Sequence, residues 1–292
     1  MEKFIYQKLD AFSVGKSKGN PAACIYLKPD QQLSDHDMLN IAIEHKGFVS
    51  EVIFCKPISK DLYELRYFSS ECEVEFCGHG TIACMYSLIA SDTELKQTKE
   101  ITIRTNRGSL AIYNELSSLN AVFITAPDPE YLSVKIETKD ISKNLEISPD
   151  EISTEYPVML IDAGLKTLIA PITNLESTLK LKPTESTLKD FCLNNGIDII
   201  LAFTTEVANK ENKIRTRVFA PKFGYLEDPA TGSGNSAMGY YMLQNGLWGG
   251  ESISIEQNAE LYDHNIVKLK TLNNKVLFGG SAITKIDGYY LL

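Results

Sequence analysis

The sequence predicts an α+β protein built from two similar halves. Its 292 residues are more than most single cores organise and suit two domains of about 100–150 residues each. The same order of strand, glycine-rich turn, apolar helix and hairpin occurs twice along the chain. An apolar fraction of 43% and a charged fraction of 23% are ordinary for a globular protein in water.

The first half is predicted to alternate strands with two helices. Ser34 is a candidate N-cap for a helix that ends near His45, and an apolar helix is expected after Gly80, over 81–90. Turn residues and runs of β-branched and aromatic side chains predict strands over 4–9, 22–27, 49–55, 63–68, 101–104 and 109–113.

The second half follows the same order after a polar crossover over about 127–155. Strands are expected over 159–163, 167–170, 199–204 and 217–219, helices over 187–194 and 236–244, and a hairpin over 253–261. We therefore divide the chain into residues 1–125 and 126–282, with a C-terminal strand at about 283–292 that packs back onto the first half.

The two halves can be aligned by counting. Arg66 precedes Cys77 by eleven residues, and Arg217 precedes Asp228 by the same number. This spacing predicts that Cys77 and Asp228 are structural counterparts. A duplicated fold offers equivalent loops to a common cleft, so the ligand is expected where the halves meet.

Composition excludes several classes of function. A net charge of −9 without a basic cluster argues against nucleic-acid binding, and no apolar run could cross a membrane. The charged N-terminus does not resemble a signal peptide, so we expect a cytoplasmic protein whose six cysteines are free thiols. No two of the four histidines have metal-ligand spacing and no nucleotide-binding motif occurs, so neither a metal nor a cofactor is predicted.

Glycine-rich turns precede both apolar helices, one at 77–80 and the other at 229–234. The first N–H groups of a helix lack intrahelical partners, and the helix dipole adds partial positive charge there. A small carboxylate is the natural ligand of such a helix end. The alternative is a purely structural role, in which the glycines serve only the tight turn between strand and helix.

Four polar side chains are candidates for chemistry. Glu51, at the edge of an apolar run, could transfer a proton, and His79 could donate to a substrate oxygen or relay a proton. Asp228 and Ser233 lie on either side of the second turn. Each also has an ordinary interpretation: a surface ion pair for Glu51, a structural hydrogen bond for His79, and helix capping for Asp228 and Ser233.

An ordered set of motifs resembles the PhzF-like family, which is named for the phenazine-biosynthesis isomerase. The most specific is Glu-Asp-Pro-Ala-Thr-Gly-Ser at 227–233, and the resemblance spans nearly the whole chain. The other motifs are Asp-Ala-Phe at 10–12, Gly-Asn-Pro-Ala-Ala at 19–23, Ser-Glu at 50–51, Arg-Tyr-Phe at 66–68, Cys-Gly-His-Gly-Thr at 77–81 and Arg-Val-Phe-Ala-Pro at 217–221.

The resemblance implies a diaminopimelate epimerase-like fold: two pseudo-symmetric halves, each a mixed β-sheet or barrel wrapped around a central helix, in a homodimer. It implies a cofactor-independent isomerase that holds a small carboxylic acid between the halves. The residues that it implies are Glu51 as the acid/base, His79, Asp228 and Ser233 as further catalytic residues, and Asn20, Gly78, Gly80, Thr231 and Gly232 as substrate contacts.

The chain departs from the family pattern at several positions, including Ser70, Val52 and the stretch 257–264. These departures favour a small carboxylic acid other than the phenazine precursor.

Two other functions stay open. One is a two-base racemase or epimerase that pairs Cys77 with Asp228, although Cys77 can also be an ordinary buried side chain. The other is a non-catalytic small-molecule binder that keeps an inherited pocket.

Overall fold

In the computed structural model, which describes residues 2–292, the chain divides into two compact units. The first comprises residues 2–125 together with 279–292, and the second comprises residues 126–278. Among the described residues, no helix combines the length and the apolar character needed to span a membrane.

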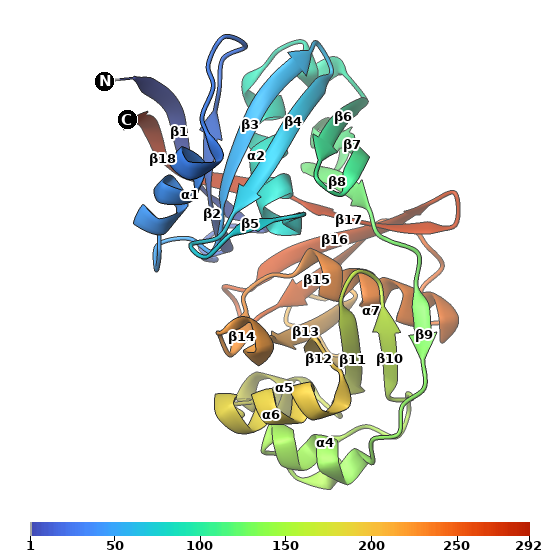
Figure 1. Cartoon of the computed structure of the whole chain (residues 1–292). Helices are drawn as coiled ribbons and strands as arrows, with labels where there is room; N and C mark the ends of the chain where they lie inside the picture. The colour runs from blue at the N-terminus through green and yellow to red at the C-terminus, as the bar shows by residue number, and fades with distance from the viewer. Residues whose placement is uncertain (1) are drawn as a thin grey trace. The chain divides into compact units, whose positions relative to one another are not determined.

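The first unit combines a mixed set of strands with one long helix, α2 (Gly78–Ser91) (Figure 1). Ser34 caps α1 (Asp35–Glu44) through a reciprocal pair of hydrogen bonds with Asp37, as its place in the sequence predicts. The unit's other elements are β1 (Lys3–Ala11), β2 (Asn20–Tyr26), α1 (Asp35–Glu44), β3 (Val52–Ser59), β4 (Leu62–Phe68), β5 (Glu73–Val74), β6 (Glu100–Thr105), β7 (Gly108–Glu115), α3 (Leu116–Leu119), β8 (Ala121–Thr125) and β18 (Ala282–Leu291).

The strands of the first unit pair in a mixed pattern. β1 is antiparallel to both β2 and β18, whereas β2 is parallel to β3 through the crossover that contains α1. β4 is antiparallel to β3 and β5 but parallel to β6, with α2 in the crossover, and β6, β7 and β8 form an antiparallel meander. α2 packs against β1, β2, β3, β8 and β18, and most of its residues between Gly80 and Ile89 are buried. It is therefore the central helix of this unit.

The second unit is built from the same kinds of element. Its long helix is α7 (Gly232–Gln244), and the second unit ends within β17 (Lys275–Gly280), at residue 278. The remaining elements are β9 (Glu130–Leu132), α4 (Thr138–Leu145), β10 (Met159–Asp162), β11 (Lys166–Pro171), α5 (Leu175–Lys180), α6 (Glu185–Asn195), β12 (Ile199–Thr204), β13 (Ile214–Phe219), β14 (Glu227–Asp228), β15 (Ile253–Gln257) and β16 (Asn265–Leu272).

The second unit repeats the pairing order of the first. β10 is antiparallel to β11, β11 is parallel to β12, and β12 is antiparallel to β13. β13 is antiparallel to the short β14 and parallel to β15, which is antiparallel to β16. α7 lies in the β13–β15 crossover, just as α2 lies between β4 and β6. Both units therefore have the same strand–helix topology.

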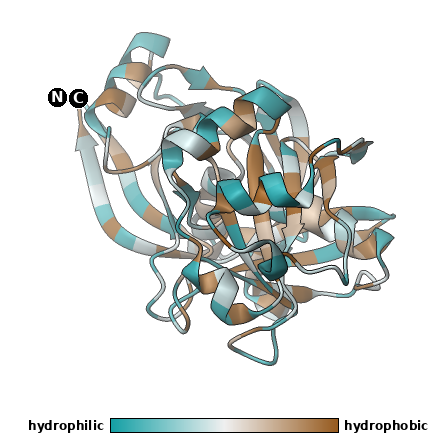
Figure 2. Ribbon diagram, turned by 90° about the horizontal axis from the view of Figure 1, so that it is seen from below, coloured by the Kyte–Doolittle hydropathy of each residue, from teal (hydrophilic) through white to brown (hydrophobic). Residues whose placement is uncertain are grey.

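Burial explains why the central helices differ from the peripheral ones. α7 packs against β10, β11, β12 and β16, and its side chains are buried around almost its whole circumference. The peripheral α1, α4 and α6 each bury only one stripe, and the ribbon in Figure 2 accordingly shows helices banded in teal and brown.

The polar segment expected as a crossover over 127–155 contains β9 and α4, and Ile141 and Leu145 of α4 enter the core of the second unit. One sequence expectation about elements is wrong. The hairpin expected over 253–261 instead joins β15 to β16 through a loop at 258–264. The periodicity of residues 258–261 does not indicate this loop, which is held by a distant arginine described below.

Candidate active site

A cluster of three polar side chains lies at the N-terminus of α2. Glu51 Oε2 is 3.6 Å from Cys77 Sγ and 3.4 Å from His79 Nε2, and Cys77 Sγ is 3.4 Å from His79 Nδ1. We call these three residues the Glu51–Cys77–His79 cluster. The side chains of Glu51 and His79 keep 22% and 13% exposure, so a small molecule can reach them. Cys77 lies deeper, at 5%.

Local backbone structure brings the cluster together. Glu51 directly precedes β3, and its carbonyl oxygen accepts a hydrogen bond from the backbone N–H of Ala23 in β2. Cys77 is the N-cap of α2, and its sulfur accepts a hydrogen bond from the backbone N–H of Gly80 at 3.3 Å. His79 is the second residue of the helix. Partial positive charge at this helix end favours an anion, either the Glu51 carboxylate or a ligand.

Two hydroxyl groups, those of Thr81 and Tyr67, support the start of α2. Thr81 Oγ1 donates to the carbonyl oxygen of Cys77 at 2.7 Å, and the hydroxyl of Tyr67 in β4 contacts Thr81 Oγ1 at 2.7 Å. Burial holds the pKa of Tyr67 well above its usual value, so its hydroxyl stays neutral. This support keeps the Cys77 backbone in one position.

Glycine is required at position 80 by close packing. A Cβ at Gly80 would lie 2.6 Å from Cδ1 of Ile53 and 3.0 Å from Cys77 Sγ. In the second unit, a Cβ at Gly232 would lie 2.4 Å from Cε2 of Phe278. Both predicted turns therefore need at least one residue without a side chain.

The second unit carries the remaining predicted residues around the start of α7. Thr231 is the N-cap, and Gly232 and Ser233 are the first two helix residues. Asp228 ends β14, where its Oδ1 accepts a hydrogen bond from the backbone N–H of Ala230 at 3.1 Å. Neither Asp228 nor Ser233 is the N-cap of α7. In the first unit, Asn20 is buried at the start of β2, opposite Ala11.

The predicted equivalence of Cys77 and Asp228 is wrong. Phe68 pairs with Glu73 in the first unit as Phe219 pairs with Glu227 in the second, and each pair leads to the N-cap of the central helix. Cys77 therefore corresponds to Thr231, not Asp228, and His79 corresponds to Ser233. Counting from the arginines fails because the loop between Phe219 and Glu227 is longer than the loop between Phe68 and Glu73.

The same alignment shows that the two helix starts are chemically different. Val52 pairs with Phe68, and Ile200 pairs with Phe219, so the counterpart of Glu51 is the apolar Ile199. Only the first unit carries a glutamate and a thiol at this place.

Sequence reasoning missed Gln257, which organises the turn of the second unit. Its amide nitrogen donates to the carbonyl oxygen of Asp228 at 2.8 Å, and its amide oxygen accepts from the Thr231 N–H at 3.0 Å and from Asn235 at 2.6 Å. Asn265 adds a bond to the carbonyl oxygen of Pro229 at 2.7 Å. Gln257 also begins the stretch 257–264 that departs from the family pattern.

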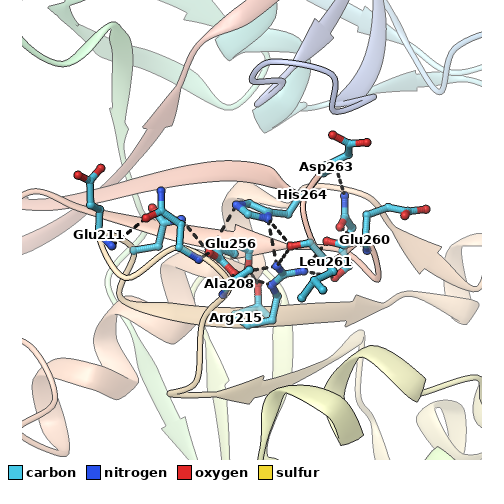
Figure 3. A network of polar contacts seen from close by, with 12 residues as sticks. Ala208, Glu211, Arg215, Glu256, Glu260, Leu261, Asp263 and His264 are labelled. Carbon is cyan, nitrogen blue, oxygen red and sulfur yellow. Dashed lines mark hydrogen bonds and ion pairs between the residues drawn. The ribbon is translucent and has the colours of Figure 1, made fainter.

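A buried ion pair holds the rest of that stretch (Figure 3). Arg215 and Glu256 have fully buried side chains and lie 2.7 Å apart. The guanidinium of Arg215 also donates to the carbonyl oxygens of Asn258, Glu260 and Leu261. Arg215 thus supplies the hydrogen bonds that the irregular loop backbone needs.

The chain is similar to a known protein family and to several curated proteins. The family model described as "Phenazine biosynthesis-like protein" matches residues 9–288. The chain is 28% identical over 256 residues to the uncharacterized isomerase YfhB of Bacillus subtilis, covering 87% of this chain and 86% of that protein. Further curated relatives from Clostridium acetobutylicum and Pseudomonas aeruginosa are also named isomerases.

Two solved structures identify the fold. A PhzF-family phenazine biosynthesis protein from Bacillus anthracis superposes with a TM-score of 0.83 at 22% identity, covering 100% of both chains. A hydroxyproline epimerase from Agrobacterium vitis superposes with a TM-score of 0.58 at 12% identity, covering 99% of this chain and 91% of that one. The predicted diaminopimelate epimerase-like fold is therefore confirmed.

Proposed function

The chain belongs to the phenazine biosynthesis-like protein family, and we propose that it is an isomerase in which Glu51 moves a proton on a small carboxylic acid. The observation that carries the proposal is the cluster geometry: Glu51 Oε2 lies 3.4 Å from His79 Nε2, beside the N-terminus of α2, and stays partly accessible. An acid/base group must be within reach of its substrate, and the partial exposure of Glu51 and its contact with His79 support this role.

In the proposed reaction, the Glu51 carboxylate takes a proton from a carbon of the substrate. The electron pair of the broken C–H bond enters the shifting double bond, and protonated Glu51 returns the proton to a second carbon. No oxidant or reductant is needed, because the atoms of substrate and product are the same. Because the counterpart of Glu51 is Ile199, one carboxyl group performs both transfers.

We assign the other residues to binding and orientation. The first N–H groups of α2 are offered to a substrate carboxylate, with close approach at Gly78 and Gly80, and the start of α7 offers the same kind of groups at Gly232. His79 donates to the substrate where negative charge develops, and Asp228, Ser233, Asn20 and Thr231 orient it. Asp228→Asn and Ser233→Ala are each expected to lower kcat/KM of the reaction that Glu51→Gln slows.

The test of the role of Glu51 is the Glu51→Gln variant with Glu71→Gln as its matched control. Glu71 is exposed and pairs with Lys46. A thermal-shift screen of cyclic and aromatic carboxylic acids identifies a ligand, and NMR in D2O follows exchange of its carbon-bound protons. Glu51→Gln should lower the exchange rate by about 10²–10⁴-fold and still bind the ligand. Unchanged exchange in this variant contradicts the proposal.

A second candidate, a racemase or epimerase, is favoured by the place of Cys77. Its sulfur caps α2 and contacts Glu51, so one thiol and one carboxyl group lie side by side within one unit. This candidate predicts exchange at an amino-acid α-carbon that Cys77→Ser removes. Exchange that survives Cys77→Ser rules out a role for the thiol in proton transfer.

A further inference from the structure

We propose that Glu51, Cys77 and His79 together bind a zinc ion. Their candidate ligand atoms form a triangle: Cys77 Sγ is 3.6 Å from Glu51 Oε2 and 3.9 Å from His79 Nε2, which is 3.4 Å from Glu51 Oε2. All of these atoms lie within 4.8 Å of one another. The three residues come from the edge of β3 and the start of α2, and Glu51 and Cys77 are 26 positions apart in sequence. Histidine spacing alone therefore does not indicate the site.

The triangle has the size that tetrahedral zinc requires. With Zn–S of about 2.3 Å and Zn–N and Zn–O of about 2.0–2.2 Å, tetrahedral angles place the ligand atoms roughly 3.4–3.6 Å apart. Two edges of the observed triangle fall in this range, and the Cys77–His79 edge exceeds it by about 0.3 Å. A rotation of the imidazole that brings Nε2 nearer to the sulfur would close that difference.

The ligand types select the metal. A thiolate and an imidazole are poor ligands for Mg²⁺ or Ca²⁺ and good ones for Zn²⁺. Three protein ligands leave the fourth zinc position to water, and the partly exposed side chains of Glu51 and His79 give the ion a path to the site.

The contacts of Cys77 hold its sulfur in place for a metal ion. The Gly80 N–H donates to its sulfur, and the positive end of the α2 dipole is directed at it. The Thr81 and Tyr67 hydroxyls hold the Cys77 backbone and so fix the direction of the ligand. Binding breaks the S–H bond, the sulfur keeps the electron pair for the metal, and the proton passes to the buffer.

Zinc at this site inhibits the enzyme, an inference that rests on the proposed function. A metal-bound Glu51 carboxylate cannot accept a substrate proton. The expected result is inhibition of proton exchange by Zn²⁺ that is reversed by a chelator.

Binding is tested without any activity measurement. Co²⁺ added to the chelator-treated full-length protein should produce the near-ultraviolet thiolate-to-cobalt absorption, with one ion per chain, and Zn²⁺ should displace it. Cys77→Ser should lose this absorption. Cys72→Ser is the matched control, because Cys72 is an exposed thiol near the cluster in sequence, and it should keep the absorption. His79→Asn should weaken Co²⁺ binding by tenfold or more and keep the thiolate band at saturation.

The outcomes separate the two proposals. No thiolate–cobalt band in the wild-type protein, or a band that Cys77→Ser retains, overturns the zinc site and leaves the role of Glu51 untouched. A band that depends on Cys77 supports the site. If Zn²⁺ then fails to slow proton exchange, inhibition is overturned, and Glu51→Gln decides separately whether Glu51 is the proton carrier.

Discussion

At the scale of single residues, Gly80 shows how tightly the cluster is supported. Its missing side chain lets Ile53 and Cys77 Sγ approach the helix, and any Cβ there would overlap with both. The neighbouring Ile53 is fully buried in β3, so it cannot move away into solvent. A side chain at position 80 would therefore disturb both the packing of Ile53 and the position of the Cys77 thiol.

Gly80→Ala is predicted to lower the free energy of unfolding by about 1–2 kcal/mol, because overpacking outweighs the gain in helix propensity. Urea unfolding measures the change. Gly288→Ala is the control, since a Cβ at Gly288 meets no atom within 4 Å, and it should stay within about 0.5 kcal/mol of the wild type. Equal effects of the two substitutions would contradict the account of Gly80.

At the scale of elements, an arginine in each unit joins a strand, β4 or β13, to the segment that leads to the central helix. We call these arginine–glutamate pairs the arginine clamps. Arg66 Nε donates to Glu73 Oε1 at 2.7 Å, and Arg217 Nε donates to Glu227 Oε1 at 2.5 Å. Each guanidinium also lies 5.2 Å from the ring of the second residue after it, Phe68 or Phe219. The clamps fix the segments that carry Cys77 and Asp228.

The clamps differ in burial, so their removal should have unequal effects. Arg217 is almost fully buried and also donates to the carbonyl oxygens of Thr178, Leu179 and Leu181 at the end of α5, whereas the Arg66 side chain is 22% exposed. Arg217→Met should cost about 3 kcal/mol of unfolding free energy, and Arg66→Met about 1 kcal/mol. Thermal or urea unfolding of both variants measures the difference, and a larger loss for Arg66→Met would contradict it.

The Arg215–Glu256 pair gives the second unit a pH dependence. Burial acts to raise the pKa of Glu256, but hydrogen bonds from Asn212, Ala208, Asn209 and Arg215 outweigh it and leave the pKa below its usual value. A carboxyl group with a lowered folded-state pKa adds stability that is present above its unfolded pKa. That stability is lost as pH falls through the folded value.

The wild-type protein should therefore lose stability on acidification below about pH 4.5 more steeply than Glu256→Gln does. At pH 7 the variant should be the less stable of the two, because Arg215 is left buried without its counter-charge. Urea unfolding between about pH 3 and pH 7, a range that includes the titration of carboxyl groups, checks both statements. Parallel pH curves for the two proteins would contradict the role of Glu256.

At the scale of the whole molecule, what could be predicted from the sequence depended on local signals. Periodicity, the Ser34 cap and the glycine turns predicted α1, α2, α7 and most strands, because these features act over a few residues. The register between the halves could not be obtained by counting, since a longer loop before Glu227 moves Thr231 into the place of Cys77. The loop at 258–264 depends on Arg215, more than forty residues upstream, and no local pattern reports that contact.

The candidate site likewise has residues that local motifs indicate and contacts that only the folded chain makes. Glu51 and His79 could be proposed from motifs. Their contact depends on the pairing of β3 with β2 and β4 and on the place where α2 begins. The supporting roles of Gln257 and of the Tyr67–Thr81 pair are tertiary contacts between side chains that look ordinary in the sequence.

The most direct test of the central claim, that Glu51 alone carries the proton, is isotope transfer within the substrate. A ligand deuterated at the carbon that loses its proton is converted in H2O, and NMR locates the label in the product. A single carboxyl carrier predicts that part of the deuterium reappears on the second carbon and that Glu51→Gln abolishes the transfer. Transfer that persists in Glu51→Gln at the wild-type rate would contradict the account.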